Sequence, residues 1–247
     1  MRRSNSTGGT LSDTATASRV ETHSDRLHRK IGLVTAPLAA ASRRLVNHPR
    51  IREAYPEYLI TVHCVIRASV PLMESALHQA RATAASDPVA DGLAVYLERH
   101  IEQERGHDEW VLEDLGVLGI DRSVLSRVPS PAVACMIGSQ YYWALHYHPV
   151  AVLGYMAVTE GYPTPPRLIE RLIESTGLPR RAFTTLMEHA ELDPDHGDEL
   201  DQIIDTLPLS RELEEVLALS AMSSVDLMAR CIEEVCEAAE ASHLSEK

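Results

Sequence analysis

Residues 88–115, PVADGLAVYLERHIEQERGHDEWVLEDL, decide the fold class of this chain. A helix that packs in a bundle carries an apolar residue at every third or fourth position, and this stretch has that spacing at both ends. Asp87 and Pro88 at its start are typical of an N-cap and a first-turn proline. The apolar positions of the face are Leu93, Leu97, Val111 and Leu115. The stretch therefore predicts one long helix, ended by Gly116 and Gly119.

The same periodicity predicts helices in most of the chain. The other expected ranges are residues 25–46, 51–82, 131–160, 166–175, 179–207 and 210–241. Pro71 is expected to kink the second helix, and Pro194 to interrupt the helix at 179–207. Phenylalanine occurs once and glycine is sparse, which favours helices over an all-β fold. The sequence predicts an all-α protein built as a single bundle of about seven helices.

The length of 247 residues and the hydrophobic content of 45% allow a sizeable core. No linker is long enough to separate two domains, so residues 23–247 are expected to form one helical domain. Residues 1–22 are rich in serine, threonine and glycine and have no apolar period. This composition predicts a disordered N-terminal tail.

Charge and cysteine content indicate the setting of the protein. A net charge of -13 repels a phosphate backbone, so no nucleic-acid partner is expected. The longest apolar stretch, residues 149–158, is about half of the ~20 residues that a membrane span needs, so no membrane association is expected. The cysteines, which lack CxxC spacing, indicate reduced thiols and a cytoplasmic protein. They are Cys64, Cys135, Cys231 and Cys236.

Polar residues interrupt the inward stripes of four predicted helices. The candidates are Glu74, His100, Glu104, His107, Glu160, His189, Asp193 and His196. A charged group in an apolar interior costs several kcal/mol unless it is paired or bound to a metal, and lysine and arginine are nearly absent from these stripes. A Glu three residues before a His is the spacing by which bundles hold paired metal ions. Mixed imidazole and carboxylate ligands suit iron or manganese better than structural zinc.

A metal-free interpretation also remains open. A single Glu-x-x-His pair is most often an exposed intrahelical contact, and several buried polar groups can form a hydrogen-bond network without a metal. His63 and His100 share the inward faces, where they are expected either to orient ligands or to make core hydrogen bonds.

These residues resemble the haem-oxygenase-like di-iron oxidase and oxygenase family, relatives of haem oxygenase, thiaminase II and the pyrroloquinoline quinone synthesis oxidase. The resemblance covers about residues 50–210 and rests on four segments. They are VPLMESAL, HIEQERGHDEWVLEDLGVLG, VLGYMAVTEG and EHAELDPDHGDELDQIIDTLPL. It implies a haem-oxygenase-like bundle with metal-ligating and catalytic roles for Glu74, Glu104, His107, Glu160, His189, Asp193 and His196, with Glu104 or Glu160 as a bridge between two ferrous ions.

The resemblance also implies a reaction. Members that oxygenate nitrogen resemble this chain in having a histidine one turn before the aspartate, here His189 before Asp193. We therefore expect an oxygenase that uses O2 and an external reductant to N-oxygenate an amine in a small metabolite of secondary metabolism. The alternatives are desaturation, decarboxylation or C–C cleavage of an amino or fatty acid, and a metal-free binding protein or cofactorless oxidase on the same scaffold.

Two expectations concern partners and substrate contacts. Bundles of this kind often pair through exposed helix faces, so a homodimer is expected. Aromatic residues on the helix that carries Glu160 are candidates for lining a substrate cavity, although core packing is the commoner role for such residues. They are Tyr141, Tyr142, Trp143 and Tyr155.

Overall fold

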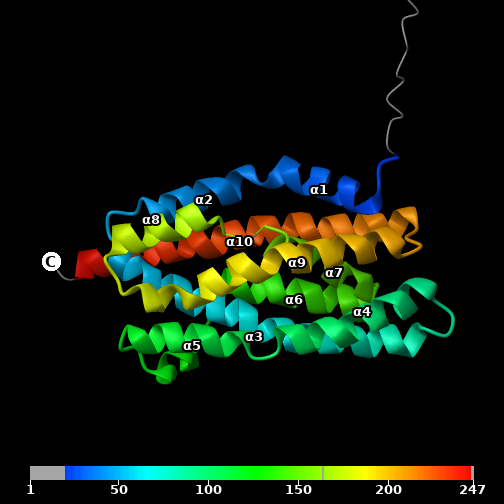
Figure 1. Cartoon of the computed structure of the whole chain (residues 1–247), viewed down its shortest axis with the longest axis horizontal. Helices are drawn as coiled ribbons and strands as arrows, with labels where there is room; N and C mark the ends of the chain where they lie inside the picture. The colour runs from blue at the N-terminus through cyan, green and yellow to red at the C-terminus, as the bar shows by residue number, and fades with distance from the viewer. Residues whose placement is uncertain (1–19, 163, 246–247) are drawn as a thin grey trace, which may run out of the picture.

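The computed structural model describes residues 20–162 and 164–245, apart from the side chains of residues 193 and 242–245. Within these ranges the chain forms ten α-helices and three short 3-10 helices, with no strand (Figure 1). The α-helices are α1 (His23–Val34), α2 (Ala36–Val46), α3 (Ile51–Thr83), α4 (Pro88–Glu104), α5 (His107–Val117), α6 (Pro131–His146), α7 (Val152–Thr159), α8 (Pro166–Thr176), α9 (Thr184–Thr206) and α10 (Arg211–Ser245). The 3-10 helices are η1 (Arg122–Ser126), η2 (Pro149–Ala151) and η3 (Arg180–Phe183). The predicted all-α class is confirmed.

The number of helices exceeds the prediction because three of the expected helices are broken. Residues 25–46 form α1 and α2, which meet at Thr35 just before a first-turn proline. Residues 88–115 are divided after Glu104, and residues 131–160 are divided by η2 at Pro149. A proline lacks the N–H that a continuing helix needs, which explains the first and third of these breaks. The helix expected from residue 179 begins with η3 and continues through Pro194 without a break.

The N-terminal part of α1 bears on the predicted tail. The expected disordered segment, residues 1–22, lies for the most part outside the described residues. Its last residue, Thr22, is ordered and forms a reciprocal capping box with Asp25. The first helix therefore begins two residues before the predicted range of 25–46.

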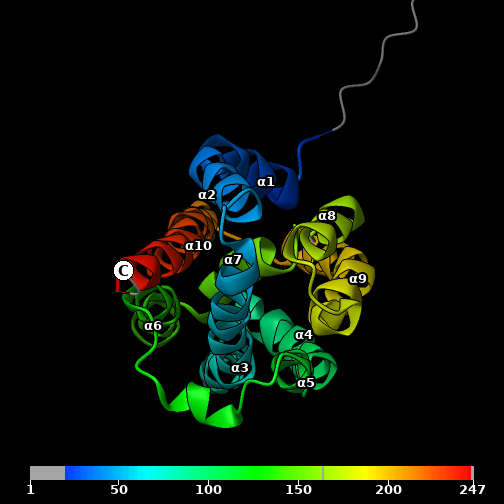
Figure 2. The same cartoon turned by 90° about the vertical axis from the view of Figure 1, so that its left-hand side faces the viewer.

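Helix α7 lies at the centre of the bundle. Seen end-on, the other helices surround it, with α10 and α6 on one side and α8 and α9 on the other (Figure 2). Every residue of α7 from Val152 to Val158 is buried. The side chain of Glu160, the C-cap of α7, is held in the interior of the bundle for this reason.

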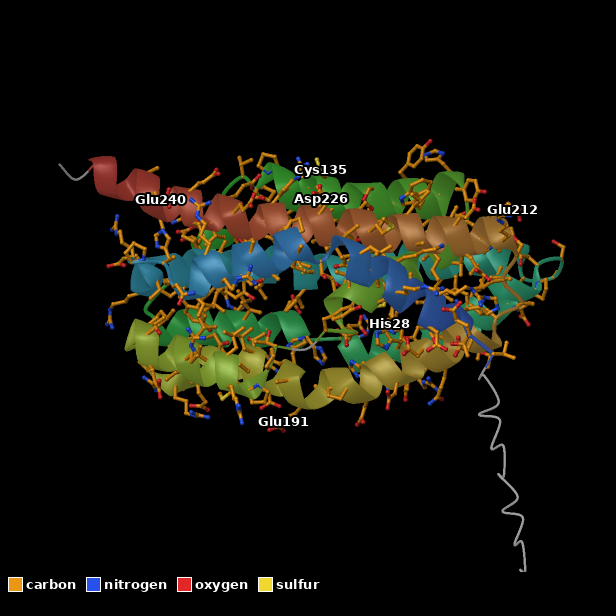
Figure 3. All side chains as sticks on the ribbon, turned by 90° about the horizontal axis from the view of Figure 1, so that it is seen from above. His28, Cys135, Glu191, Glu212, Asp226 and Glu240 are labelled. Carbon is orange, nitrogen blue, oxygen red and sulfur yellow. The ribbon has the colours of Figure 1, made fainter. Side chains whose placement is uncertain are left out.

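The outer surface of the bundle is charged. The acidic side chains of Glu191, Glu212, Asp226 and Glu240 project outward in Figure 3. Helix α3 is long and apolar enough to cross a membrane by length and composition alone, a test that core helices of bundles also pass. In this fold α3 packs against α4, α5, α6 and α10.

Candidate metal centre

Four helices bring imidazole and carboxylate groups to one buried point. His100 and Glu104 lie on the last two turns of α4, His107 begins α5, and Glu160 is the C-cap of α7. Helix α9 contributes His189 and His196. The residues of α4 and α5 in this set are at most 8% exposed, and His196 is 7% exposed. Four of the six side chains are therefore buried, whereas Glu160 and His189 are half-buried.

The candidate ligand atoms form two groups that share Glu104. In each group, one ligand atom from each residue lies within 4.8 Å of the others. The first group is Glu104, His107 and His189, and the second is His100, Glu104 and Glu160. His196 adjoins both groups, because its Nδ1 lies 3.3 Å from Oε1 of Glu104. One carboxylate common to two groups is an arrangement suited to a pair of metal ions.

Several of these atoms have no hydrogen-bond partner although they are close together. Nε2 of His100 lies 3.1 Å from Oε2 of Glu160, and Nδ1 of His107 lies 3.1 Å from Oε2 of Glu104. Both ring nitrogens of His100, Nδ1 of His107 and Oε2 of Glu160 are nevertheless buried without hydrogen-bond geometry to any partner. Buried polar atoms are rarely left in this state, because each costs about 1–3 kcal/mol. Carboxylate oxygens and imidazole nitrogens that converge without such partners are suited to a cation.

The break between α4 and α5 positions the Glu104 and His107 side chains. The sequence predicts one helix through both residues, but the chain turns at Gly106, whose φ of 94° lies in the left-handed region. Arg105 is extended between them. The two side chains therefore meet because the backbone bends, whereas the sequence analysis expected them to share one helical face.

The orientation of His189 follows from a backbone contact. Its Nδ1 lies 2.8 Å from the carbonyl oxygen of Thr185, so Nδ1 donates the hydrogen bond and Nε2 is left as the acceptor nitrogen. Thr185 is itself fixed by the buried Asp114 on α5, whose carboxylate accepts from the backbone N–H groups of Thr184 and Thr185 at 3.0 and 2.9 Å. Asp114 thus ties the helix that begins with His107 to the helix that carries His189.

The electrostatics of the cluster favour an ionised Glu104 and a neutral His189, and they raise the pKa of His100. Burial acts to raise the pKa of Glu104, but its contacts with His107 and His196 outweigh burial and hold this pKa well below its usual range. Burial lowers the pKa of His189. Burial also acts to lower the pKa of His100, but the adjacent Glu160 carboxylate reverses this effect and raises it. Glu104 is thus ionised and His189 neutral near neutral pH, the forms in which both bind metals.

Glu74 does not join the cluster. Its side chain is 50% exposed and lies 3.4 Å from the guanidinium of Arg105. The sequence predicts that Glu74 lies on the inward face of its helix, and the structure corrects this placement. Five turns of about 3.6 residues lead from the buried Tyr55 to Met73, so the core face of α3 passes through Met73 and its neighbour Glu74 points outward.

The remaining candidates have different positions. Asp193 lies within α9, and its side chain is outside the described residues. His63 is 3% exposed on α3 and belongs to neither group. His100, which the sequence analysis ranked as an orienting residue, lies in the second group. The sequence feature that indicates His100 is its position in the polar part of the inward stripe, because His100 lies one helical turn before Glu104.

A cavity of about 210 Å³, here called the inner cavity, reaches the cluster. Glu104, Glu160 and His189 line it, and most of its other lining residues are apolar or neutral polar. Its aromatic lining residues are Tyr58 and Tyr162, which the sequence analysis did not select. None of the four aromatic candidates lines it. The exposed Tyr142 lies on the surface, and Tyr155 packs in the core, with its hydroxyl 3.2 Å from that of the lining residue Ser69.

Solved structures with similar folds support the architecture. The chain resembles a domain of unknown function with a heme oxygenase-like fold from Shewanella denitrificans OS217, with a TM-score of 0.74 and 18% identity over 87% of this chain and 92% of that chain. It also resembles a TenA homologue from Pseudomonas syringae pv. tomato DC3000, with a TM-score of 0.68 and 17% identity over 87% and 93% of the two chains. A CADD-like protein of unknown function from Nostoc punctiforme PCC 73102 matches with a TM-score of 0.64 and 16% identity over 89% and 95%. These likenesses establish the predicted haem-oxygenase-like fold.

Family membership rests on the sequence. A search of curated proteins gave no match. The family described as iron-containing redox enzyme matches residues 76–229, which is more than half of the chain and includes all six described residues of the cluster. The family name agrees with the predicted iron cofactor and with an oxidoreductase activity. This chain belongs to the iron-containing redox enzyme family, on a haem-oxygenase-like fold.

Proposed function

We propose that this protein is a non-haem di-iron oxygenase that uses O2 and electrons from an external donor to oxygenate the nitrogen of a small amine. One observation carries the di-iron part of the proposal. Buried nitrogen and oxygen atoms of His100, His107 and Glu160 converge without hydrogen-bond partners around the shared carboxylate of Glu104. Positive ions at this point would satisfy one nitrogen of each histidine and the carboxylate oxygen.

The donor set fits iron. Glu104, His107 and His189 would hold one ion, and His100, Glu104 and Glu160 the other, with Glu104 between them. Imidazole and carboxylate donors without thiolates suit iron or manganese, and the family name favours iron. Asp193 and His196 remain proposed ligands on α9, whereas the exposed Glu74 is not proposed.

Iron bound at this site would supply the activation of O2. N-oxygenation places one oxygen atom on nitrogen and reduces the other to water, so two electrons must come from a donor outside the chain. The residues of the chain provide position and a dry environment. The inner cavity reaches Glu104, Glu160 and His189, and its apolar walls exclude water from the place where the substrate nitrogen would lie.

The choice of nitrogen as the oxygenated atom rests on His189. A histidine one turn before Asp193 resembles the pattern of N-oxygenating family members. The hydrogen bond through Nδ1 leaves Nε2 as the acceptor nitrogen of His189, and His189 belongs to the first group, which supports its role as an additional ligand.

A ferrous titration under nitrogen tests the di-iron proposal. We expect the chain to bind about two iron ions, measured by metal analysis after gel filtration. Binding of less than about one iron per chain under ferrous excess would instead favour the metal-free binding protein or cofactorless oxidase. Exposure of the loaded protein to O2 with candidate amines, followed by mass spectrometry, tests the reaction. A product one oxygen atom heavier at nitrogen is expected.

A second candidate reaction uses the same metal pair on carbon. The apolar walls of the inner cavity, which include Val62, Val65 and Ile66, would also hold a hydrocarbon chain next to the cluster. Desaturation, decarboxylation or C–C cleavage of an amino or fatty acid would follow. Product analysis separates the two candidates, since carbon chemistry leaves the amine nitrogen unoxidised.

A further inference from the structure

A second cavity, here called the outer cavity, has a volume of about 260 Å³ and lies between α3, α6, α10 and the segment around η1. Its interior walls are formed by side chains such as Ile60, Cys64 and Val133. Arg127, Glu57 and Val128 are at its mouth, where Val128 is 93% exposed and Arg127 pairs with Glu57 at 3.0 Å. No residue of the candidate metal centre lines this cavity.

The inner and outer cavities follow one another along the same three helices. Thr61 on α3 lines both. On α6, Met136 lines the inner cavity and Val133, one turn earlier, lines the outer cavity. On α10, Cys231 lines the inner cavity and Ala238, two turns later, lines the outer cavity. Since α6 runs opposite to α10 (Figure 1), both shifts lead toward the same end of the bundle.

The two cavities differ in charge. The described residues that line the inner cavity include no lysine or arginine, and its ionisable groups other than tyrosine and cysteine belong to the metal centre. The outer cavity has Arg127, Glu57 and Glu234 at its rim. A ligand that spans both would therefore be apolar along its length, reactive at its inner end and able to carry a polar group at its outer end.

We propose that the inner and outer cavities form one elongated site for a substrate with an extended apolar chain, whose reactive end lies at the metal centre and whose far end reaches the Arg127–Glu57 pair. This inference rests on the proposed function for the identity of the reactive end. The size of the inner cavity supports it, because pockets that enclose a whole metabolite of moderate size usually exceed about 300 Å³. The seven residues from Cys231 to Ala238 add about 10 Å along the helix axis.

A chain-length series tests the proposal by calorimetry on the full-length chain as purified, under nitrogen. The probes are butylamine, hexylamine, octylamine and decylamine. We expect the affinity to rise by about fourfold for each methylene that the site covers, as expected for burial of apolar surface. An affinity that stops rising at butylamine would overturn the proposal, because the inner cavity alone would then hold the ligand.

Two pairs of variants locate the bound chain. Ala238→Trp fills the outer cavity from an exposed position, and Glu237→Trp places the same side chain on the neighbouring exposed residue, which lines neither cavity. Thr61→Phe fills the junction, and Thr61→Val keeps its size. The ratio of decylamine to butylamine affinity should fall at least tenfold in Ala238→Trp and Thr61→Phe, and should stay within twofold of the original in the matched controls. An unchanged ratio in both filled variants would contradict the proposal.

The identity of the reactive end is tested separately with carboxylates of the same chain lengths. Dependence on chain length with either class of head group supports the elongated site. A preference for the carboxylates, or chain-length dependence without amine oxygenation by the iron-loaded protein, would count against the proposed function and leave the elongated site standing. Amine oxygenation without any dependence on chain length would overturn only the elongated site.

Discussion

Two buried polar clusters in this bundle have opposite properties. Between α6 and α10, the amide of Gln140 accepts from Ser220 at 2.8 Å and donates to Ser224 at 3.3 Å, and Ser224 donates to the backbone of Ser220. In the metal centre, the corresponding polar atoms of His100 and Glu160 lie 3.1 Å apart without hydrogen-bond geometry. Both clusters are buried, but only the first is satisfied by the protein itself.

This difference separates a structural polar cluster from a functional one. Donors and acceptors alternate in the amide and hydroxyl cluster, so it stabilises the contact between two helices without any ligand. The metal centre offers carboxylate oxygens and imidazole nitrogens, with few donors and no lysine or arginine in either group. Buried charged groups of this kind are compatible with a stable fold when a metal ion from solution binds them.

Removing the shared carboxylate should have the largest effect. In Glu104→Ala, iron binding should fall more than about 100-fold and O2-dependent chemistry should be lost, because both ligand groups lose their common member. The helical circular dichroism should be unchanged, since no hydrogen bond that holds the bundle together is removed. Iron content per chain and O2 consumption are the measurements.

A matched control uses an exposed carboxylate near the same helix. Glu74→Ala removes a group that is 50% exposed, so it should leave iron content unchanged. If Glu74→Ala abolished iron binding and Glu104→Ala did not, the assignment of the centre to the buried residues would be wrong.

Packing around the satisfied cluster predicts the next largest effect. Gly154 on α7 lies against the backbone of α10, where an added Cβ would overlap the carbonyl oxygen of Leu217 and crowd the nitrogen of Ala221. Gly154→Ala should therefore lower the free energy of unfolding by about 3 kcal/mol, measured by urea denaturation. Gly138→Ala is the matched control, because Gly138 lies inside α6 with open space around its Cα. It should stabilise the chain by about 0.5–1 kcal/mol.

The comparison of the two clusters is sharpened by replacing one member of each with leucine. Gln140→Leu removes the acceptor of the Ser220 hydroxyl and the donor to the Ser224 hydroxyl, and it should cost about 2 kcal/mol of unfolding free energy. His100→Leu removes a 3.1 Å contact with Glu160 that lacks hydrogen-bond geometry, so in the metal-free chain it should cost less than Gln140→Leu. Urea denaturation of both variants without metal measures the two losses of unfolding free energy. A larger loss in His100→Leu would mean that the centre is a structural network after all.

The sequence predicts the fold class and the ends of the helices better than it predicts the positions where helices break. Amphipathic periods and local capping residues such as Asp87 act over one or two turns, and the structure confirms the all-α fold that they indicate. The break at Gly106 was not predicted, because an isolated glycine in a helical pattern is compatible with either outcome. The outward position of Glu74 was missed for a geometric reason. An error of one residue in a stripe turns a side chain by about 100°.

The membership of the metal centre was predictable only in part. A stripe reveals which residues face inward on one helix, and it selected Glu104, His107 and Glu160, which the structure brings together. It does not reveal which inward residues from different helices share a point along the bundle axis. For that reason the sequence analysis ranked His63 and His100 alike, although only His100 lies in the cluster.

The smallest predicted effect concerns the N-terminal end of α4, which lies opposite to the end that carries Glu104. Asp87 caps this helix by accepting from the backbone N–H groups of Val89 and Ala90, and its second oxygen lies 2.9 Å from Nε2 of His148. Burial acts to raise the pKa of Asp87, but the contacts with His148 and the N–H groups outweigh it and lower this pKa. Because the folded pKa is lower than the unfolded value of about 3.9, the stabilisation is complete above about pH 5 and is lost as the pH falls through the folded pKa.

Asp87→Ala should cost about 1 kcal/mol near neutral pH, and urea denaturation should show this cost shrinking in acid. Asp87→Asn, which keeps the cap, should lose less at neutral pH. An equal loss in both variants would instead show that the carboxylate charge accounts for the whole effect and that the cap hydrogen bonds contribute nothing.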